Sequence, residues 1–162
     1  MIPFKKALKE IFELEMAPGG CLQDYCDEVL ESSFKNMSSA AVGAICLGDH
    51  KATDSDTGDL QDRHRLIHLD ILCLSAIYNR SKNLEEDAEE QSYNLARRVR
   101  MILKNANVRK LISTSYPLGL ALDCVVTDED TETLAFGEMI CRSNTIRVMI
   151  YLREDYGEYF SG

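Results

Sequence analysis

The residues best suited to metal chemistry in this chain are two histidines followed by an aspartate. His64, His68 and Asp70 fall at even spacings, so a strand would place all three on one face. Imidazole and carboxylate groups are common zinc ligands. Residues four apart in a strand are, however, about 13 Å apart, too far for both imidazoles to reach one ion at about 2 Å. We therefore interpret the row as a solvated or interfacial face, to which His50 adds no partner, and we predict no metal site.

An acidic segment that resembles a calcium-binding loop is the second candidate. An EF-hand loop needs glycine at its sixth position and a bidentate glutamate at its twelfth. Counted from Asp54, the glycine comes fifth, as Gly58, and the twelfth residue is Arg65. We therefore predict that residues 49–62 form a mobile acidic loop that contains no calcium site. Its aspartates include Asp54, Asp56, Asp59 and Asp62.

Nucleophilic chemistry would have to come from the cysteines, and their placement does not favour it. None of the six forms a Cys-x-x-Cys pair, and four lie in apolar, strand-like runs (Cys46, Cys73, Cys124 and Cys141). Such residues are typical of reduced core thiols in a reducing compartment, with disulfides as the alternative. The sequence also has no glycine-rich phosphate loop and no nucleophile elbow. We predict no catalytic residue, no enzyme activity and no cofactor.

Composition narrows the class of protein further. The chain has 162 residues, 45% hydrophobic and 28% charged, which predicts one globular domain over residues 1–162. Its net charge of −9 disfavours proteins that hold nucleic acid through its phosphates, and those drawn to anionic membranes. The N-terminus resembles no secretory signal, and no apolar run approaches the ~20 residues of a membrane span. We expect a soluble protein in a cytoplasm, with no membrane partner.

Hydrophobic periodicity predicts three helical stretches. Phe4, Leu8, Ile11 and Phe12 form one apolar stripe. A second helical stripe covers residues 22–30. The longest helix is expected over residues 83–105, where acidic residues precede basic ones and thus complement the helix dipole. Its predicted buried residues are Ala88, Leu95, Val99, Ile102 and Leu103.

Four strands are expected from runs of period two. They cover residues 40–48, 64–76, 118–126 and 138–152, with an acidic turn at 128–130 and a polar tail at 155–162. The element order predicts an α+β fold. Its sheet would be mainly antiparallel and four-stranded, made of two hairpins, packed by the long central helix and joined by N-terminal helices.

This order of elements resembles the tail terminator and tail-completion proteins of tailed bacteriophages. The strongest likeness is Leu95–Leu152, from the helix end Arg97-Arg98-Val99-Arg100-Met101-Ile102-Leu103 to the strand Thr145-Ile-Arg-Val-Met-Ile-Tyr-Leu152. The helical stretch 22–30 departs from the family pattern. The resemblance implies a virion protein of the tail or neck, made in the host cytoplasm. It would form a ring, usually a hexamer, that caps the tail tube and ends its polymerisation. Its partners would be the tube protein and the head-completion (connector) protein, and DNA would pass through without specific binding.

The strand at 64–76 has apolar residues on both faces, although one helix layer covers only one face of a sheet. A neighbouring subunit or the N-terminal helices could cover the other face. The candidate interface residues are Leu66, His68, Leu72, Leu74, Arg147, Met149 and Tyr151. The aspartates of the acidic loop could line a lumen that repels DNA, or could contact the tail tube. Two alternatives remain, another neck or head-completion connector protein and a small cytoplasmic enzyme or ligand-binding domain.

Overall fold

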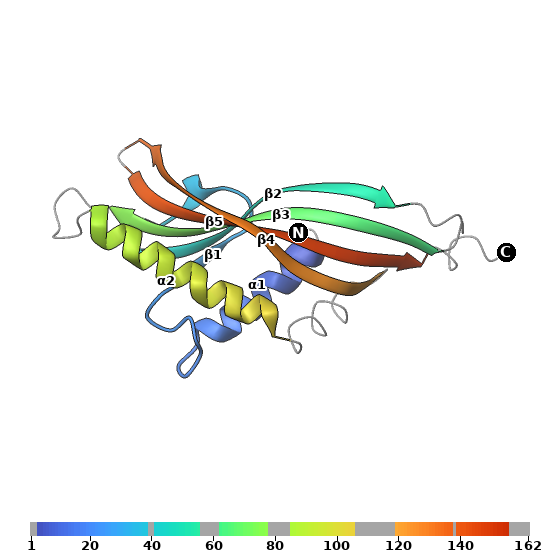
Figure 1. The fold of residues 1–162 in the computed structure, drawn as a ribbon. Coiled ribbons are helices and arrows are strands. Elements are labelled where there is room, and N and C mark those ends of the chain that lie inside the picture. The colour runs from blue at the N-terminus through green and yellow to red at the C-terminus, as the bar shows by residue number, and fades with distance from the viewer. Residues whose placement is uncertain are drawn as a thin grey trace.

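The computed structural model describes residues 3–38, 41–55, 62–77, 85–105, 119–137 and 139–155. In this part of the chain, one five-stranded sheet carries two α-helices on the same face (Figure 1). The helices are α1 (Pro3–Met16) and α2 (Glu85–Lys104), and a 3-10 turn, η1, spans Phe34–Asn36. Across the sheet the strands run β1 (Glu28–Leu30), β2 (Gly43–Ser55), β3 (Asp62–Ile77), β5 (Met139–Asp155) and β4 (Gly119–Phe136).

The α+β class and the two hairpins are confirmed, because β2 pairs antiparallel with β3 and β4 with β5. The two hairpins join through β3 and β5, which are antiparallel from Asp62 opposite Asp155 to Ile77 opposite Ile140. The sheet nevertheless has five strands and not four, and it is mixed, because β1 runs parallel to β2.

The main core lies between the sheet and the two helices. The predicted stripes of α1 and α2 are buried there, as is one face of β3. Burying such stripes is what stabilises helices of this length, since isolated helices are marginal in water. The fully buried large side chains of this core include Leu8, Phe12, Ile45, Leu47, Ile67, Leu69, Ile71, Leu95 and Leu103.

The predicted helix over residues 22–30 is wrong. Residues 21–25 form turns, Asp24 has a left-handed φ of 69°, and the chain then extends into β1. The carboxylate of Asp27 accepts hydrogen bonds from the backbone N–H groups of Val42 (2.7 Å) and Gly43 (3.2 Å). These contacts hold the segment beside the start of β2, where backbone pairing with β2 replaces helical hydrogen bonds.

The predicted mobile loop over residues 49–62 is also wrong at both ends. Residues 49–55 continue β2, and Asp62 begins β3, so Asp54 and Asp62 belong to paired strands. Asp56 and Asp59 lie outside the described residues. The polar composition concealed a strand because a β-ladder needs only backbone groups, and exposed positions of a strand accept polar side chains.

The predicted acidic turn at residues 128–130 is wrong for a similar reason. Asp128, Glu129 and Asp130 lie inside β4, just after a bulge between Val126 and Asp128. The chain instead turns from β4 into β5 near Gly137, whose positive φ of 62° suits glycine. Arginines from neighbouring elements pair with all three carboxylates, which removes the electrostatic reason for a solvated turn.

A second, smaller core lies on the opposite face of the sheet, at one end. The segment from Leu30 to Ala41, with η1 in it, packs against the start of β2 and the ends of β3 and β5. Part of the face opposite the helices is therefore covered by an extended N-terminal segment, whereas α1 packs beside α2. This core contains Leu30, Met37, Ala41, Ala44, Cys46, Leu74, Ala76 and Cys141, with Phe34, Leu72 and Leu134 partly buried against it.

Candidate functional site

The remainder of that face, which we call the open face, carries exposed and half-buried side chains of β3, β4 and β5. His68 and Val125 are exposed there, and Leu66 and Met149 are half-buried. Strand pairing places His68 opposite Met149, and Met149 opposite Val125. Leu66, Met149 and Val125 form what we call the apolar band, which crosses β3, β5 and β4 beside His68.

The structure places most of the predicted interface residues together on this face; the exceptions are Leu74 and Tyr151. Leu74 is fully buried in the second core, so its assignment to an interface is wrong, and Leu72 is half-buried beside it. The side chain of Tyr151 lies outside the described part of the chain. The interface prediction missed the second core because nothing in the pattern of residues 30–41 indicated that they fold over the sheet.

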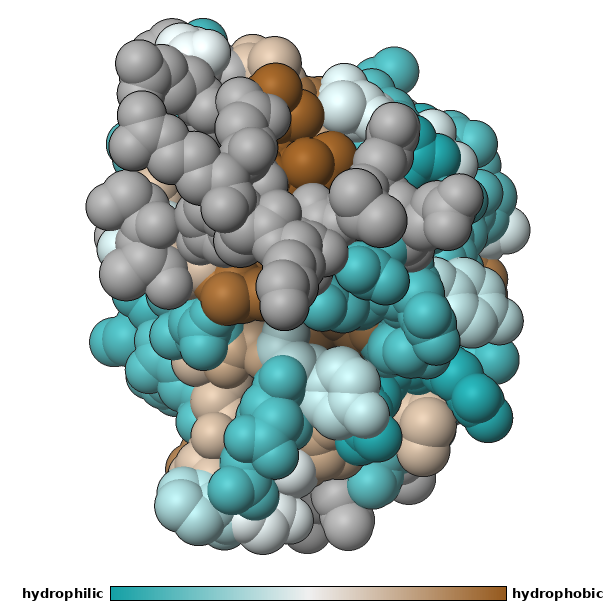
Figure 2. Space-filling view, turned by 90° about the vertical axis from the view of Figure 1, so that its left-hand side faces the viewer, coloured by the Kyte–Doolittle hydropathy of each residue, from teal (hydrophilic) through white to brown (hydrophobic). Residues whose placement is uncertain are grey.

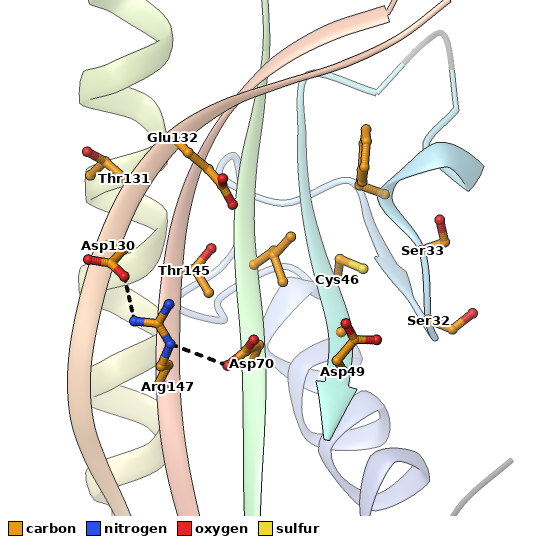
Figure 3. A pocket seen from close by; sticks show the side chains of 13 residues that line it. Ser32, Ser33, Cys46, Asp49, Asp70, Asp130, Thr131, Glu132, Thr145 and Arg147 are labelled. Carbon is orange, nitrogen blue, oxygen red and sulfur yellow. Dashed lines mark hydrogen bonds and ion pairs between the residues drawn. The ribbon is translucent and has the colours of Figure 1, made fainter. Parts of the chain in front are cut away.

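Next to the apolar band lies a cluster of charges around Arg147. Its guanidinium is 2.8 Å from a carboxylate oxygen of Asp128, 2.5 Å from one of Asp130 and 3.7 Å from one of Asp70. Figure 3 shows Arg147 between Asp130 on β4 and Asp70 on β3. The hydrogen bonds that Arg147 donates to the carboxylates of Asp130 and Asp128 raise its pKa. Three carboxylates thus share one cation, and the cluster is negative overall. The sequence pattern predicts Arg147 at an interface but does not indicate these partners.

The cluster forms one side of a groove of about 500 Å³ on the open face. Ser32 and Ser33 form the opposite wall, and Thr145 lies between (Figure 3). Phe34 and Leu72 also line the groove. Besides Arg147, its charged lining residues are Asp49, Asp70, Asp130 and Glu132. Four carboxylates against one guanidinium leave an excess of three negative charges, so the groove favours a cationic partner.

A buried lysine shapes the edge of this groove. The Nζ of Lys5 on α1 donates to the backbone oxygens of Gly48 (2.7 Å) and Leu47 (3.4 Å). These carbonyls lie at the bulge of β2, where pairing with β3 is interrupted between Leu47 and His50. Lys5 therefore supplies hydrogen bonds at an irregular point in the ladder and helps to hold the bulge that carries Asp49. The only sign of this role in the sequence was a lysine directly beside the apolar stripe of α1.

The opposite side of the molecule presents an exposed row on α2, which we call the outer stripe. It consists of Glu90, Tyr93, Arg97, Met101 and Lys104, all exposed and at spacings of three or four. Tyr93 is 50% and Met101 61% exposed. At the end of the molecule where α2 begins, the surface is mainly hydrophilic, and hydrophobic areas appear in separate patches (Figure 2).

The cysteines with described side chains are poorly placed for nucleophilic catalysis. Burial raises the pKa of Cys26 to about 12 and those of Cys46 and Cys141 to about 11. Burial also raises the pKa of the fully buried Cys73. A thiol is a weak nucleophile until it ionises, so these groups act as core residues at neutral pH. The side chain of Cys124 lies outside the described residues.

The predicted histidine row is not assembled into a metal site by the residues that the structure describes. Asp70 pairs with Arg147, and His68 is exposed. In the described ranges, no group of three or more His, Cys, Asp or Glu side chains is arranged so that it could hold a metal ion. The side chain of His64 lies outside them.

No protein-family model matches the chain, and no curated protein matches it. In the described ranges, no helix has the length and apolar character needed to cross a membrane. Functional inference therefore depends on the open face, the groove and the outer stripe.

Proposed function

We propose that this protein is a structural component of a tailed-phage virion, a tail terminator that forms a hexameric ring on the end of the tail tube. The order of α1, hairpin, long helix α2 and second hairpin supports this function through the resemblance described above. In this function the ring stops tube polymerisation and presents a surface to the head-completion (connector) protein.

The observation that carries the proposal is the composition of the open face. A sheet face that meets only water is normally polar, yet Leu66, Met149 and Val125 lie together on this one. Met and Arg are enriched in protein interfaces, and Arg147 adjoins the apolar band. The face thus has the residues of a docking surface and favours an assembly role.

The acidic hairpin formed by β2 and β3 supports a role around DNA. In Figure 1 its strands extend beyond both α1 and α2 toward one end of the molecule. Asp54 and Asp62 lie in the strands on either side of residues 56–61. In a ring, this end would line the lumen, where carboxylates repel the phosphates of passing DNA and keep it from adhering.

The direct test removes the protein from its phage and examines the tails by negative-stain electron microscopy. The proposal expects tails of irregular, excessive length that fail to join heads, with normal tails restored when the protein is supplied in trans. A mutant that lacks the head connector is the control, since its tails should have normal length. Tails of normal length that join heads without this protein would refute the proposal.

A connector or head-completion protein is the nearest alternative within the virion, and binding separates the two. A terminator should bind the end of purified tail tubes, whereas a connector should bind DNA-filled heads that lack tails. Gold-labelled protein added to each preparation would show which end it occupies.

A ligand-binding or enzymatic domain is the alternative from another class, and the groove is its one support. Its volume of about 500 Å³ lies within the range of small-molecule sites, but such sites are mostly apolar, whereas this lining is rich in carboxylates. Thermal unfolding with nucleotides and divalent cations would test it, because a ligand that binds the native state raises the Tm.

A further inference from the structure

We propose that the outer stripe of α2 in one copy docks on the open face of the next copy, with Arg97 at the carboxylates around Arg147. This contact rests on the proposed ring and specifies how its subunits meet. The occupant of the open face is then a second copy of this chain, identified by complementary charge and by the order of residue types on the two surfaces.

The order of residue types matches between the two surfaces. Along the open face, Asp70 and Asp128 flank Arg147 in a band that is negative overall. This band lies between two apolar areas, Met149 with Val125 on one side and Leu72 with Phe34 on the other. Along the outer stripe, Arg97 lies between Tyr93 and Met101. Each surface thus has a charged part between two apolar parts. The charge is positive at Arg97 on the outer stripe and negative at the carboxylates of the open face.

The spacing matches as well. Successive residues on one face of a strand are about 7 Å apart, which sets the distance from one band to the next. Residues four apart in a helix are about 6 Å apart along its axis. If α2 of one copy lies along the strands of the next and Arg97 meets the acidic band, Tyr93 and Met101 each lie over one of the two apolar areas.

Charge selects one of the two possible directions. The outer stripe begins with Glu90 and ends with Lys104. On the open face, Lys51 lies beside His68 at the apolar band, whereas Glu132 lies at the far end of the groove. Attraction at both ends requires Tyr93 over Met149 and Met101 toward Phe34, which brings Lys104 to Glu132. The reverse direction places like charges together at both ends.

The two surfaces differ, so the contact is head-to-tail. A contact between unlike patches generates a closed ring when each copy is turned relative to the last, and a filament when the rotation does not close. Glu90 and Tyr93 line a depression with Thr131 of β4 and Asn144 of β5, so this part of the stripe faces the β4 side of the sheet.

The test measures self-association of the full chain by sedimentation velocity up to millimolar concentration. The substitution Arg97→Glu should weaken association by about tenfold or more, because like charges then meet in the acidic band. Lys6→Glu, at an exposed position of α1, is the matched control and should leave association unchanged. Far-UV circular dichroism and the Tm should be the same for both variants, since neither side chain is buried.

A complementation experiment tests two features together: the direction of α2 along the open face, and the identity of its partner as a second copy of this chain. Lys104→Glu and Glu132→Lys should each weaken association, because each places like charges at the end of the groove. An equimolar mixture of the two variants should associate again, since each then offers a surface that complements the other. Glu132→Gln is the neutral control, with an effect smaller than that of Glu132→Lys.

Three results would overturn the contact. They are a wild-type chain that stays monomeric at millimolar concentration, association unchanged by Arg97→Glu, and a mixture that associates no better than its components. If wild-type rings form and resist Arg97→Glu, the open face has another occupant while the ring function stands. The tail-length phenotype tests that function separately.

Discussion

At the scale of single residues, Lys5 shows how a charge is accommodated at the edge of a core. Its side chain is only 7% exposed, and its ammonium donates to the carbonyl oxygens of Gly48 and Leu47. A buried charge is tolerated when hydrogen-bond acceptors replace water. The bulge of β2 supplies these acceptors, because the register with β3 shifts after Leu47 and Gly48 has no partner residue in β3.

Replacing Lys5 with methionine should therefore destabilise the protein. The change leaves the carbonyl oxygens at the bulge without their donor, and the lost hydrogen bonds to a charged group should lower the free energy of unfolding by about 1.5–3 kcal/mol. Urea unfolding followed by circular dichroism measures this difference. Lys6→Met, at the exposed neighbouring position, should change stability by less than about 0.5 kcal/mol. Equal losses in the two variants would contradict the role of Lys5.

The buried thiols predict how stability depends on alkaline pH. Burial raises the pKa of Cys46 and Cys141 from 9.0 to about 11. The unfolded chain therefore releases these protons at lower pH than the native chain. The stabilisation that this difference provides is fully present below pH 9 and is lost as the pH rises toward 11.

The double variant Cys46→Ala/Cys141→Ala should accordingly lose less stability than the wild type over this interval. Each thiol contributes a slope of up to about 1.4 kcal/mol per pH unit. Urea unfolding under reducing conditions, at a series of alkaline pH values, measures how the free energy of unfolding changes with pH in the wild type and in the variant. The double variant keeps every tyrosine and lysine of the wild type, so the difference between the two slopes reports on the thiols alone. Identical slopes would show that neither thiol is shielded in the native state.

At the scale of the elements, Arg147 binds carboxylates from both strands beside its own. Asp70 comes from β3, and Asp128 and Asp130 come from β4. Acidic residues inside an edge strand also discourage uncontrolled pairing with other chains. Without the guanidinium, the three carboxylates would repel one another across the open face.

Arg147→Met should lower the stability of the protein at neutral pH and low salt. The loss should shrink in molar salt, because ions screen repulsion between exposed carboxylates. Urea unfolding at low and high salt measures both quantities. Arg97→Met, which changes the same charge on the far side of α2, is the matched control and should show little loss at either salt concentration. A loss from Arg147→Met that does not depend on salt would indicate lost packing in place of lost charge pairing.

At the scale of the whole molecule, substitutions in the β2–β3 hairpin test its proposed role in DNA passage. Replacing Asp54, Asp56, Asp59 and Asp62 with lysine should slow DNA ejection and reduce infectivity, because lysines in a lumen would bind phosphates. The corresponding four asparagine substitutions should have a smaller effect. Potassium release during infection and plaque counts measure the two quantities. Unchanged ejection with lysine at all four positions would exclude a lumenal role for these charges.

The sequence by itself determined the elements whose pattern is local. The apolar stripes of α1 and α2 and the alternation along β3 and β5 predicted those four elements, because side-chain direction repeats every 3.6 residues in a helix and every two in a strand. The same reasoning predicted the α+β class and placed Arg147 and Met149 on one face.

Only the tertiary structure decided which polar segments are strands and which parts of the sheet stay open. Residues 49–55 and 128–130 have the composition of loops, yet they pair with β3 and β5. The segment Leu30–Ala41 covers Leu74. These outcomes depend on backbone pairing and on contacts between residues far apart in the chain, and local periodicity carries no information about either.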